Sequence, residues 1–138
     1  MFPYPMQLSF KVHKPSDFIF NYLTDMQLFA SVHPVITRIE QAGNNEYKVF
    51  EKFMLGPIPY AFTYKAFLQS DKFQNMVTIN AIVMRLTKIE MQFHIVEEHG
   101  FCTVNEKVTF KSPLPIQSLM QKVFKSQHTK LFENIDKL

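Results

Sequence analysis

Glu106 is the side chain in this sequence best placed for acid–base chemistry. It shares one face of its predicted strand with four small or apolar residues, Cys102, Val104, Val108 and Phe110. An isolated buried charge is too costly to leave unpaired, so this carboxylate is either paired, hydrated or functional. We expect Glu106 to accept a hydrogen bond or a proton from a ligand, or to be a strand-end residue bonded to a neighbouring Lys or Tyr.

Glu51 is a second candidate acid or base. It is in phase with three residues on one face of its strand, Tyr47, Val49 and Phe53, but Phe50 and Met54 make the opposite face apolar too. Its direction therefore stays open, and we favour a solvent-facing side chain. If Glu51 and Glu106 faced one cavity, their like charges would push one pKa upward and create an acid–base pair.

His128 is the third candidate. It lies four residues after Phe124 and seven before Ile135, which puts it on the apolar stripe of a C-terminal helix. It could point into a cavity as a base or a hydrogen-bond donor, or lie at the stripe edge, bonded to backbone or water. His94 is out of phase with its apolar neighbours and is predicted to face solvent, while His33, just before a proline, is predicted to be structural.

No metal site, cofactor or phosphate loop is predicted. The five histidines are far apart, and no His or Cys pair has the spacing of metal ligands. Glycine occurs only at positions 43, 56 and 100, each in a predicted turn, which excludes a glycine-rich loop. The single cysteine, Cys102, alternates with buried residues and is interpreted as a small core hydrophobe.

Aromatic residues predict the wall of an apolar binding site. Tyr60, Phe62 and Tyr64 share one face of a long strand, and their phenol tips could bond a carbonyl or hydroxyl group of an apolar ligand. The same row could equally fill the core. The residues that we expect to line the ligand-binding site are Tyr47, Phe53, Tyr60, Phe62, Tyr64, Met91, Phe93, Val104, Glu106, Phe124 and His128.

The elements that must position these residues follow one another in a simple order. A strand over 6–12 precedes a helix that starts at Pro15, a break at Thr24-Asp25 and a second short helix that ends at His33-Pro34. Alternating patterns then predict six strands, over 35–41, 47–54, 58–69, 73–84, 88–96 and 101–110. After a Pro-rich break comes a helix of about 22 residues, whose apolar stripe is Leu119, Met120, Val123, Phe124, Leu131, Ile135 and Leu138.

This order predicts an α+β fold in which a curved, seven-stranded antiparallel sheet wraps around the long C-terminal helix. One helix cannot cover so wide a sheet if the sheet is flat, so the sheet must curl. A curled sheet with a helix across its mouth encloses space. We therefore expect an apolar cavity between the sheet and the C-terminal helix.

Three short segments add a family resemblance. They are Phe10–Pro15 before the first helix, His33–Ile36 at the second strand, and Thr103–Glu106 before the last helix. With the element order, they resemble the START-like (SRPBCC) superfamily and its helix-grip fold, in the small bacterial polyketide cyclase/dehydrase and coenzyme-Q-binding-like branches. The resemblance implies a cavity for lipids, sterols, polyketides, quinones or plant hormones, and some members are enzymes.

Composition limits the remaining choices. The 138 residues suit one domain over 1–138, and 15 Phe with 8 Met suit a dense core or a deformable pocket. The net charge of +3 is spread along the chain, which argues against nucleic-acid binding. No signal-peptide pattern and no apolar stretch near the ~20 residues of a bilayer span occur, so we expect a cytoplasmic protein without stable membrane insertion.

Three functions fit these observations. The first is binding or carriage of a small hydrophobic molecule such as a lipid, a quinone or a polyketide-like aromatic compound. The second is a cyclase or dehydratase that uses Glu106, with Glu51 or His128, as acid and base, and Tyr64 to polarise a carbonyl. The third is a macromolecular interaction module, supported by the lysines of the last helix. A homodimer through the outer sheet face is compatible with all three.

Overall fold

The computed structural model describes residues 5–115 and 117–138. Residues 1–4, where the sequence shows no signal-peptide pattern, and residue 116 lie outside the described residues. The elements in chain order are β1 (Met6–Val12), α1 (Ser16–Thr24), α2 (Met26–Val32), β2 (Ile36–Gly43), β3 (Glu46–Leu55), β4 (Ile58–Asp71), β5 (Met76–Val83), β6 (Thr87–Glu97), β7 (Cys102–Lys111) and α3 (Gln117–Asp136).

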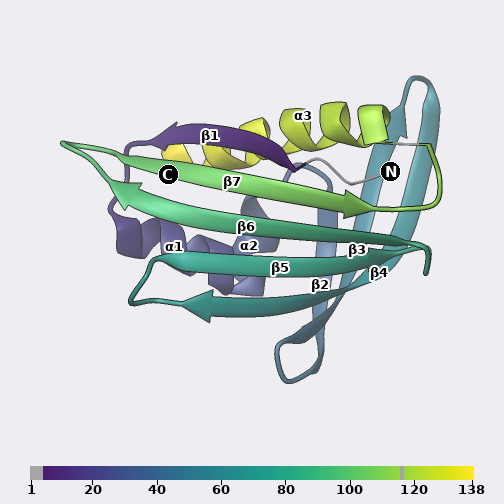
Figure 1. The fold of residues 1–138 in the computed structure, drawn as a ribbon, viewed down its shortest axis with the longest axis horizontal. Coiled ribbons are helices and arrows are strands. Elements are labelled where there is room, and N and C mark those ends of the chain that lie inside the picture. The colour runs from purple at the N-terminus through teal and green to yellow at the C-terminus, as the bar shows by residue number, and fades with distance from the viewer. Residues whose placement is uncertain (1–4, 116) are drawn as a thin grey trace.

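All seven strands form one antiparallel sheet in the order β1-β7-β6-β5-β4-β3-β2. The strands from β2 to β7 are a meander, and β1 returns to pair with β7 at its edge. The sheet curves, and α3 runs alongside β1 and β7 while α1 and α2 lie behind the other strands (Figure 1). The predicted α+β helix-grip architecture is therefore confirmed.

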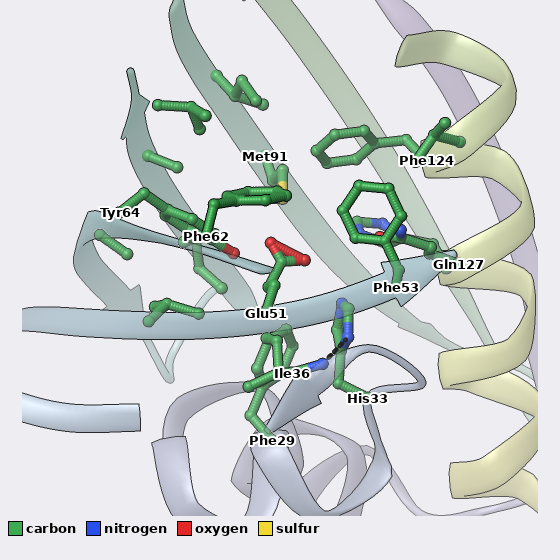
Figure 2. Close-up of a pocket in the computed structure, with 18 of the residues that line it drawn as sticks. Phe29, His33, Ile36, Glu51, Phe53, Phe62, Tyr64, Met91, Phe124 and Gln127 are labelled. Carbon is green, nitrogen blue, oxygen red and sulfur yellow. Dashed lines mark hydrogen bonds between the residues drawn. The ribbon is translucent and has the colours of Figure 1, made fainter. Parts of the chain in front are cut away.

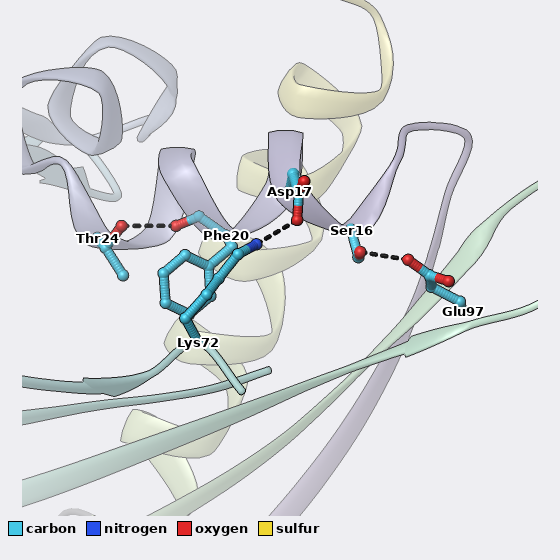
Figure 3. Close-up of polar contacts among 6 residues, drawn as sticks. All are labelled: Ser16, Asp17, Phe20, Thr24, Lys72 and Glu97. Atoms are coloured by element: carbon cyan, nitrogen blue, oxygen red, sulfur yellow. Dashed lines mark hydrogen bonds and ion pairs between the residues drawn. The ribbon is translucent and has the colours of Figure 1, made fainter. Parts of the chain in front are cut away.

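The first two helices are held by polar contacts at their starts. Asp25 caps α2, because its side chain accepts hydrogen bonds from the backbone N–H groups of Gln27 and Leu28 at 3.0 and 3.2 Å. At the start of α1, the Ser16 hydroxyl donates to Glu97 of β6 (Figure 3).

An ion pair joins the first turn of α1 to the β4–β5 turn. Lys72 bonds to the carboxylate of Asp17, and its ammonium group lies 4.6 Å from the centre of the Phe20 ring (Figure 3). Both charged side chains of the ion pair are largely exposed, so the pair itself adds little stability.

The core is built around one face of α3. Phe132 is 2% exposed and stacks on Phe10 of β1, with ring centres 4.5 Å apart. The buried face also contains His128, Leu131 and Ile135. The stripe predicted from the sequence omitted Phe132, which lies directly beside Leu131. It also included Leu119 and Leu138, which are about half exposed at the two ends of the helix.

One strand boundary was predicted wrongly. The fifth strand was expected to begin at Phe73, but β4 continues to Asp71 and Phe73 lies in the following turn, 98% exposed. The side chain of Asp71 accepts a hydrogen bond from the backbone N–H of Gln74 and stabilises that turn, and Asn75 completes it with φ of +54°. The other strands begin and end within two residues of their predicted bounds.

The tips of β3 and β4 project beyond their neighbours. β2 pairs with β3 only as far as Glu51, and β5 pairs with β4 only from Lys65 onward. Residues 53–60, which pair only with one another across the hairpin, therefore form a free two-stranded tip, which we call the ribbon. Figure 1 shows it extending past the sheet near the start of α3. Gly56, with φ of +61°, forms the turn at its tip.

Within residues 5–115 and 117–138, no helix combines the length and apolar character needed to cross a bilayer.

Candidate functional site

A cavity lies between the concave face of the sheet and α3, as the curled sheet predicted. The volume of this cavity is about 120 Å³. Apolar side chains form most of its wall. Its aromatic members come from four elements: Phe29 of α2, Phe53 of β3 in the ribbon, Phe62 and Tyr64 of β4, and Phe124 of α3.

Glu51 points into this cavity (Figure 2), so the expected solvent-facing side chain was wrong. It lies opposite Phe62 in the β3–β4 ladder, on the same sheet face as Tyr64. Phe50, the neighbour of Glu51, lies on the opposite, outward face of β3. The guanidinium group of Arg38 covers its ring there, 4.0 Å from the ring centre.

The environment of Glu51 raises the pKa of its carboxyl group toward neutral pH. Burial raises the pKa of Glu51 to about 7, while a hydrogen bond from the Tyr64 hydroxyl and the nearby His128 oppose this rise. Burial and the adjacent Glu51 raise the pKa of Tyr64 well above its ordinary value. Tyr64 therefore stays protonated and donates a hydrogen bond to Glu51. A carboxyl group that titrates near pH 7 suits a general base.

Glu106 and His128 form a buried pair. Nδ1 of His128 lies 2.7 and 2.6 Å from the two carboxylate oxygens of Glu106, and the residues are 2% and 1% exposed, respectively. Glu106 projects inward from β7 as predicted, but its partner is His128 rather than a Lys or Tyr. Its carboxyl group lies behind the imidazole and does not line the cavity, whereas the ring of His128 does.

His33 is both a structural residue, as predicted, and part of the cavity wall. It ends α2, and its Nδ1 accepts hydrogen bonds from the backbone N–H groups of Val35 and Ile36 at 3.2 and 3.3 Å. Burial and the neighbouring His128 lower the pKa of His33 to about 3. It is therefore neutral, and its one proton resides on Nε2. Its ring centre lies 6.2 Å from that of His128.

The structure brings together seven of the residues proposed from the sequence: Glu51, Phe53, Phe62, Tyr64, Met91, Phe124 and His128 all line the cavity. The remaining five lie elsewhere. Tyr47 is near the β2–β3 turn, Tyr60 is 44% exposed on the ribbon, and Phe93 and Val104 are fully buried in the core, as is Glu106. Strand phase alone cannot separate cavity wall from solid core.

Sequence reasoning missed several lining residues on the helices. Phe29 belongs to the apolar stripe of α2, and Gln127 precedes His128 on α3. The stripe of α2 was visible in the sequence, but nothing indicated that it faced the cavity. Among the described residues, no three His, Cys, Asp or Glu side chains converge in a way that could hold a metal ion.

Comparison with solved structures finds the same fold. A START superfamily protein from Mycobacterium smegmatis superposes with a TM-score of 0.75 at 12% identity, covering 96% of this chain and 94% of that one. The Zhui aromatase/cyclase from Streptomyces sp. R1128 gives 0.72 at 10% identity, covering 96% and 91%. Norcoclaurine synthase from Thalictrum flavum gives 0.72 at 13% identity, covering 98% and 85%.

These identities are low enough that the likeness establishes fold alone. A comparison with curated proteins finds no match. The model of one family, the CoxG subunit of carbon monoxide dehydrogenase, matches residues 9–136, which is nearly the whole chain. Together with the START-like fold that its sequence patterns resemble, this match shows that the chain belongs to the CoxG family.

Proposed function

We propose that the protein binds, and carries, a small hydrophobic molecule in the cavity between the sheet and α3. The observation that supports this most is the enclosed apolar wall, with aromatic side chains contributed by the ribbon, β4, α2 and α3. Well-formed apolar pockets with a few convergent polar groups are the usual form of a small-molecule site. The family name also describes an enzyme subunit, which fits a binding role beside a partner enzyme.

The cavity volume limits the ligand that fits without movement. Apolar cavities of roughly 150 Å³ accept one benzene ring, so a cavity of about 120 Å³ suits a single ring. A lipid, quinone or polyketide-like molecule needs more room. Movement of the ribbon would supply it, because Phe53 lies where the hairpin pairs with no flanking strand, and Phe62 lies just below, where β4 pairs only with β3.

The setting of this function is also a proposal. A cytoplasmic location fits the single cysteine, Cys102, which is free and buried. A homodimer through the outer face of the sheet remains a prediction that size-exclusion chromatography with light scattering would test.

Native mass spectrometry of gently purified protein, followed by organic extraction, tests the proposed function. We expect a hydrophobic molecule of defined mass to accompany the protein. Ala81 is 3% exposed and lines the cavity, so Ala81→Leu should fill the space and abolish this adduct. Ala61→Leu adds the same volume at an exposed position of β4 and should retain it. An adduct that survives Ala81→Leu unchanged would place binding outside the cavity.

A second candidate function is proton-transfer catalysis of the kind a cyclase or dehydratase performs. The titration of Glu51 near pH 7, inside a cavity that His128 also lines, favours it. Glu51 would remove a proton from a carbon next to a carbonyl group, and the imidazole would stabilise the oxygen of the resulting enolate. Glu106 would act only through His128, because its carboxyl group does not reach the cavity.

The test of this second function uses acetophenone, an enolisable ketone with a single ring, in deuterated buffer. Proton NMR follows the exchange of its α-protons. We expect exchange above the buffer rate with the parent protein and a return to the buffer rate with Glu51→Gln. Exchange at the parent rate in Glu51→Gln would remove the proposed base.

A further inference from the structure

We propose that the end of the cavity formed by Glu51 and His128 is a subsite for the hydroxyl group of a phenol or a similarly acidic enol. Glu51 accepts the hydrogen bond that this hydroxyl donates, and Nε2 of His128 donates one to its oxygen. The inference rests on the proposed binding function and names the chemical class of ligand. It begins from the buried pair behind the cavity wall.

The net charge of the Glu106–His128 pair determines whether Nε2 of His128 carries a proton that it can donate in a hydrogen bond to a ligand. An unpaired carboxylate is too costly to bury, and Glu106 has no side-chain partner except His128 among the described residues. A net neutral pair exists in two forms: carboxylate with imidazolium, or carboxylic acid with neutral imidazole that accepts at Nδ1. Nε2 carries a proton in both forms, so the pair always has a donor on that side of the ring.

That donor faces the cavity. Nδ1 is turned toward Glu106, which lies outside the cavity, so the ring edge that lines the cavity is the opposite one. No hydrogen bond to Nε2 is made within residues 5–115 and 117–138. A buried N–H without a partner is a binding element for an acceptor atom.

His33 adds a second donor of the same kind. Because its Nδ1 accepts two backbone hydrogen bonds, its proton is on Nε2. Figure 2 shows the free edge of the His33 ring directed toward the space between Glu51 and Phe53. Two imidazole N–H groups and one carboxyl group therefore border the same end of the cavity.

A hydroxyl group matches this arrangement best. It accepts from an imidazole N–H and donates to a carboxylate, whereas a carbonyl or ether oxygen can only accept. Tyr64 already occupies one acceptor position of Glu51, and a carboxylate has about four, so room for a second donor remains. Phe29, Phe53 and Phe62 supply apolar walls for the ring that bears the hydroxyl.

Three single-ring probes of nearly equal size test the subsite: 4-ethylphenol, 4-ethylanisole and ethylbenzene. Their affinities are measured by NMR titration of the full chain at pH 8, where Glu51 is mostly ionised because its pKa is about 7. A hydrogen bond to a charged group predicts that 4-ethylphenol binds about tenfold more tightly than 4-ethylanisole. Glu51→Gln should remove most of this preference while leaving ethylbenzene affinity unchanged.

Two further variants test whether the imidazole donor contributes to this preference. Glu106→Leu/His128→Leu removes that donor without leaving a buried charge, and it should also reduce the hydroxyl preference. Tyr60→Phe removes an exposed hydroxyl group on the ribbon and should leave the preference intact. Binding of all three probes with equal affinity would overturn the subsite but not the proposed function. Failure of all three to bind would overturn both.

Discussion

Replacement of His128 by leucine should expose the cost of leaving Glu106 alone in the core. Glu106 is 1% exposed, and its carboxyl group meets Nδ1 of His128 at 2.6 to 2.7 Å. In the variant, this carboxyl group stays buried without its partner. Removal of one partner of a buried charge pair typically costs ~3–5 kcal/mol, because the other partner then has neither water nor a counter-charge.

Urea denaturation of parent and variant at pH 7, monitored by circular dichroism, measures this cost. His94→Leu is the matched control, because His94 is exposed on β6, and it should change stability by less than about 0.5 kcal/mol. Glu106→Leu/His128→Leu should be within about 1 kcal/mol of the parent or more stable. A His128→Leu variant that loses less than about 1 kcal/mol of unfolding free energy would refute the reasoning.

Four other changes have clear expected outcomes. Phe132→Ala removes a fully buried ring and should cost about 3–5 kcal/mol in urea denaturation; a cost below about 1 kcal/mol would contradict its central place in the core. Tyr64→Phe removes a hydrogen bond that lowers the pKa of Glu51, so carboxyl NMR titration should show that pKa rising above about 7. Because the pKa of Glu51 is raised in the folded state, the parent loses stability as pH rises toward 7, and Glu51→Gln should be more stable relative to the parent at pH 8 than at pH 5. Asp25→Ala should cost about 1 kcal/mol through loss of the α2 cap, and an unchanged urea midpoint would argue against that cap.

The fold was predictable because its local signals agree with one another. Alternating apolar residues, turn residues between strands and a Pro-rich break before the last helix each specify an element, and these elements leave few ways to build a core. The fifth strand was misplaced because Phe73 looks apolar in the sequence. The pattern cannot show that the side chain of Asp71 holds a turn there.

The site was only partly predictable, because its contacts join residues distant in sequence. Periodicity placed Glu106 on the apolar face of its strand and His128 on the apolar stripe of α3, with the direction of His128 left open. Their pairing depends on how α3 crosses β7. The direction of the Glu51 side chain was predicted wrongly because Phe50, beside it on the strand, looks equally suited to the interior. In the structure Phe50 faces outward, where Arg38 on the neighbouring strand covers its ring. Such shielding depends on strand register, which one strand's pattern does not contain.

Because neither β2 nor β5 pairs with the ribbon, the ribbon can move to open the cavity without unfolding the rest of the protein. Its amides bond only across the hairpin, so the ribbon can bend away from α3 without breaking a hydrogen bond to the rest of the sheet. Native-state hydrogen exchange should then show residues 53–60 as a unit of low protection, while β6 and β7 exchange only through global unfolding. A protein built in this way can acquire a new ligand by changing the length or side chains of one hairpin, and the core that keeps it folded need not change with it.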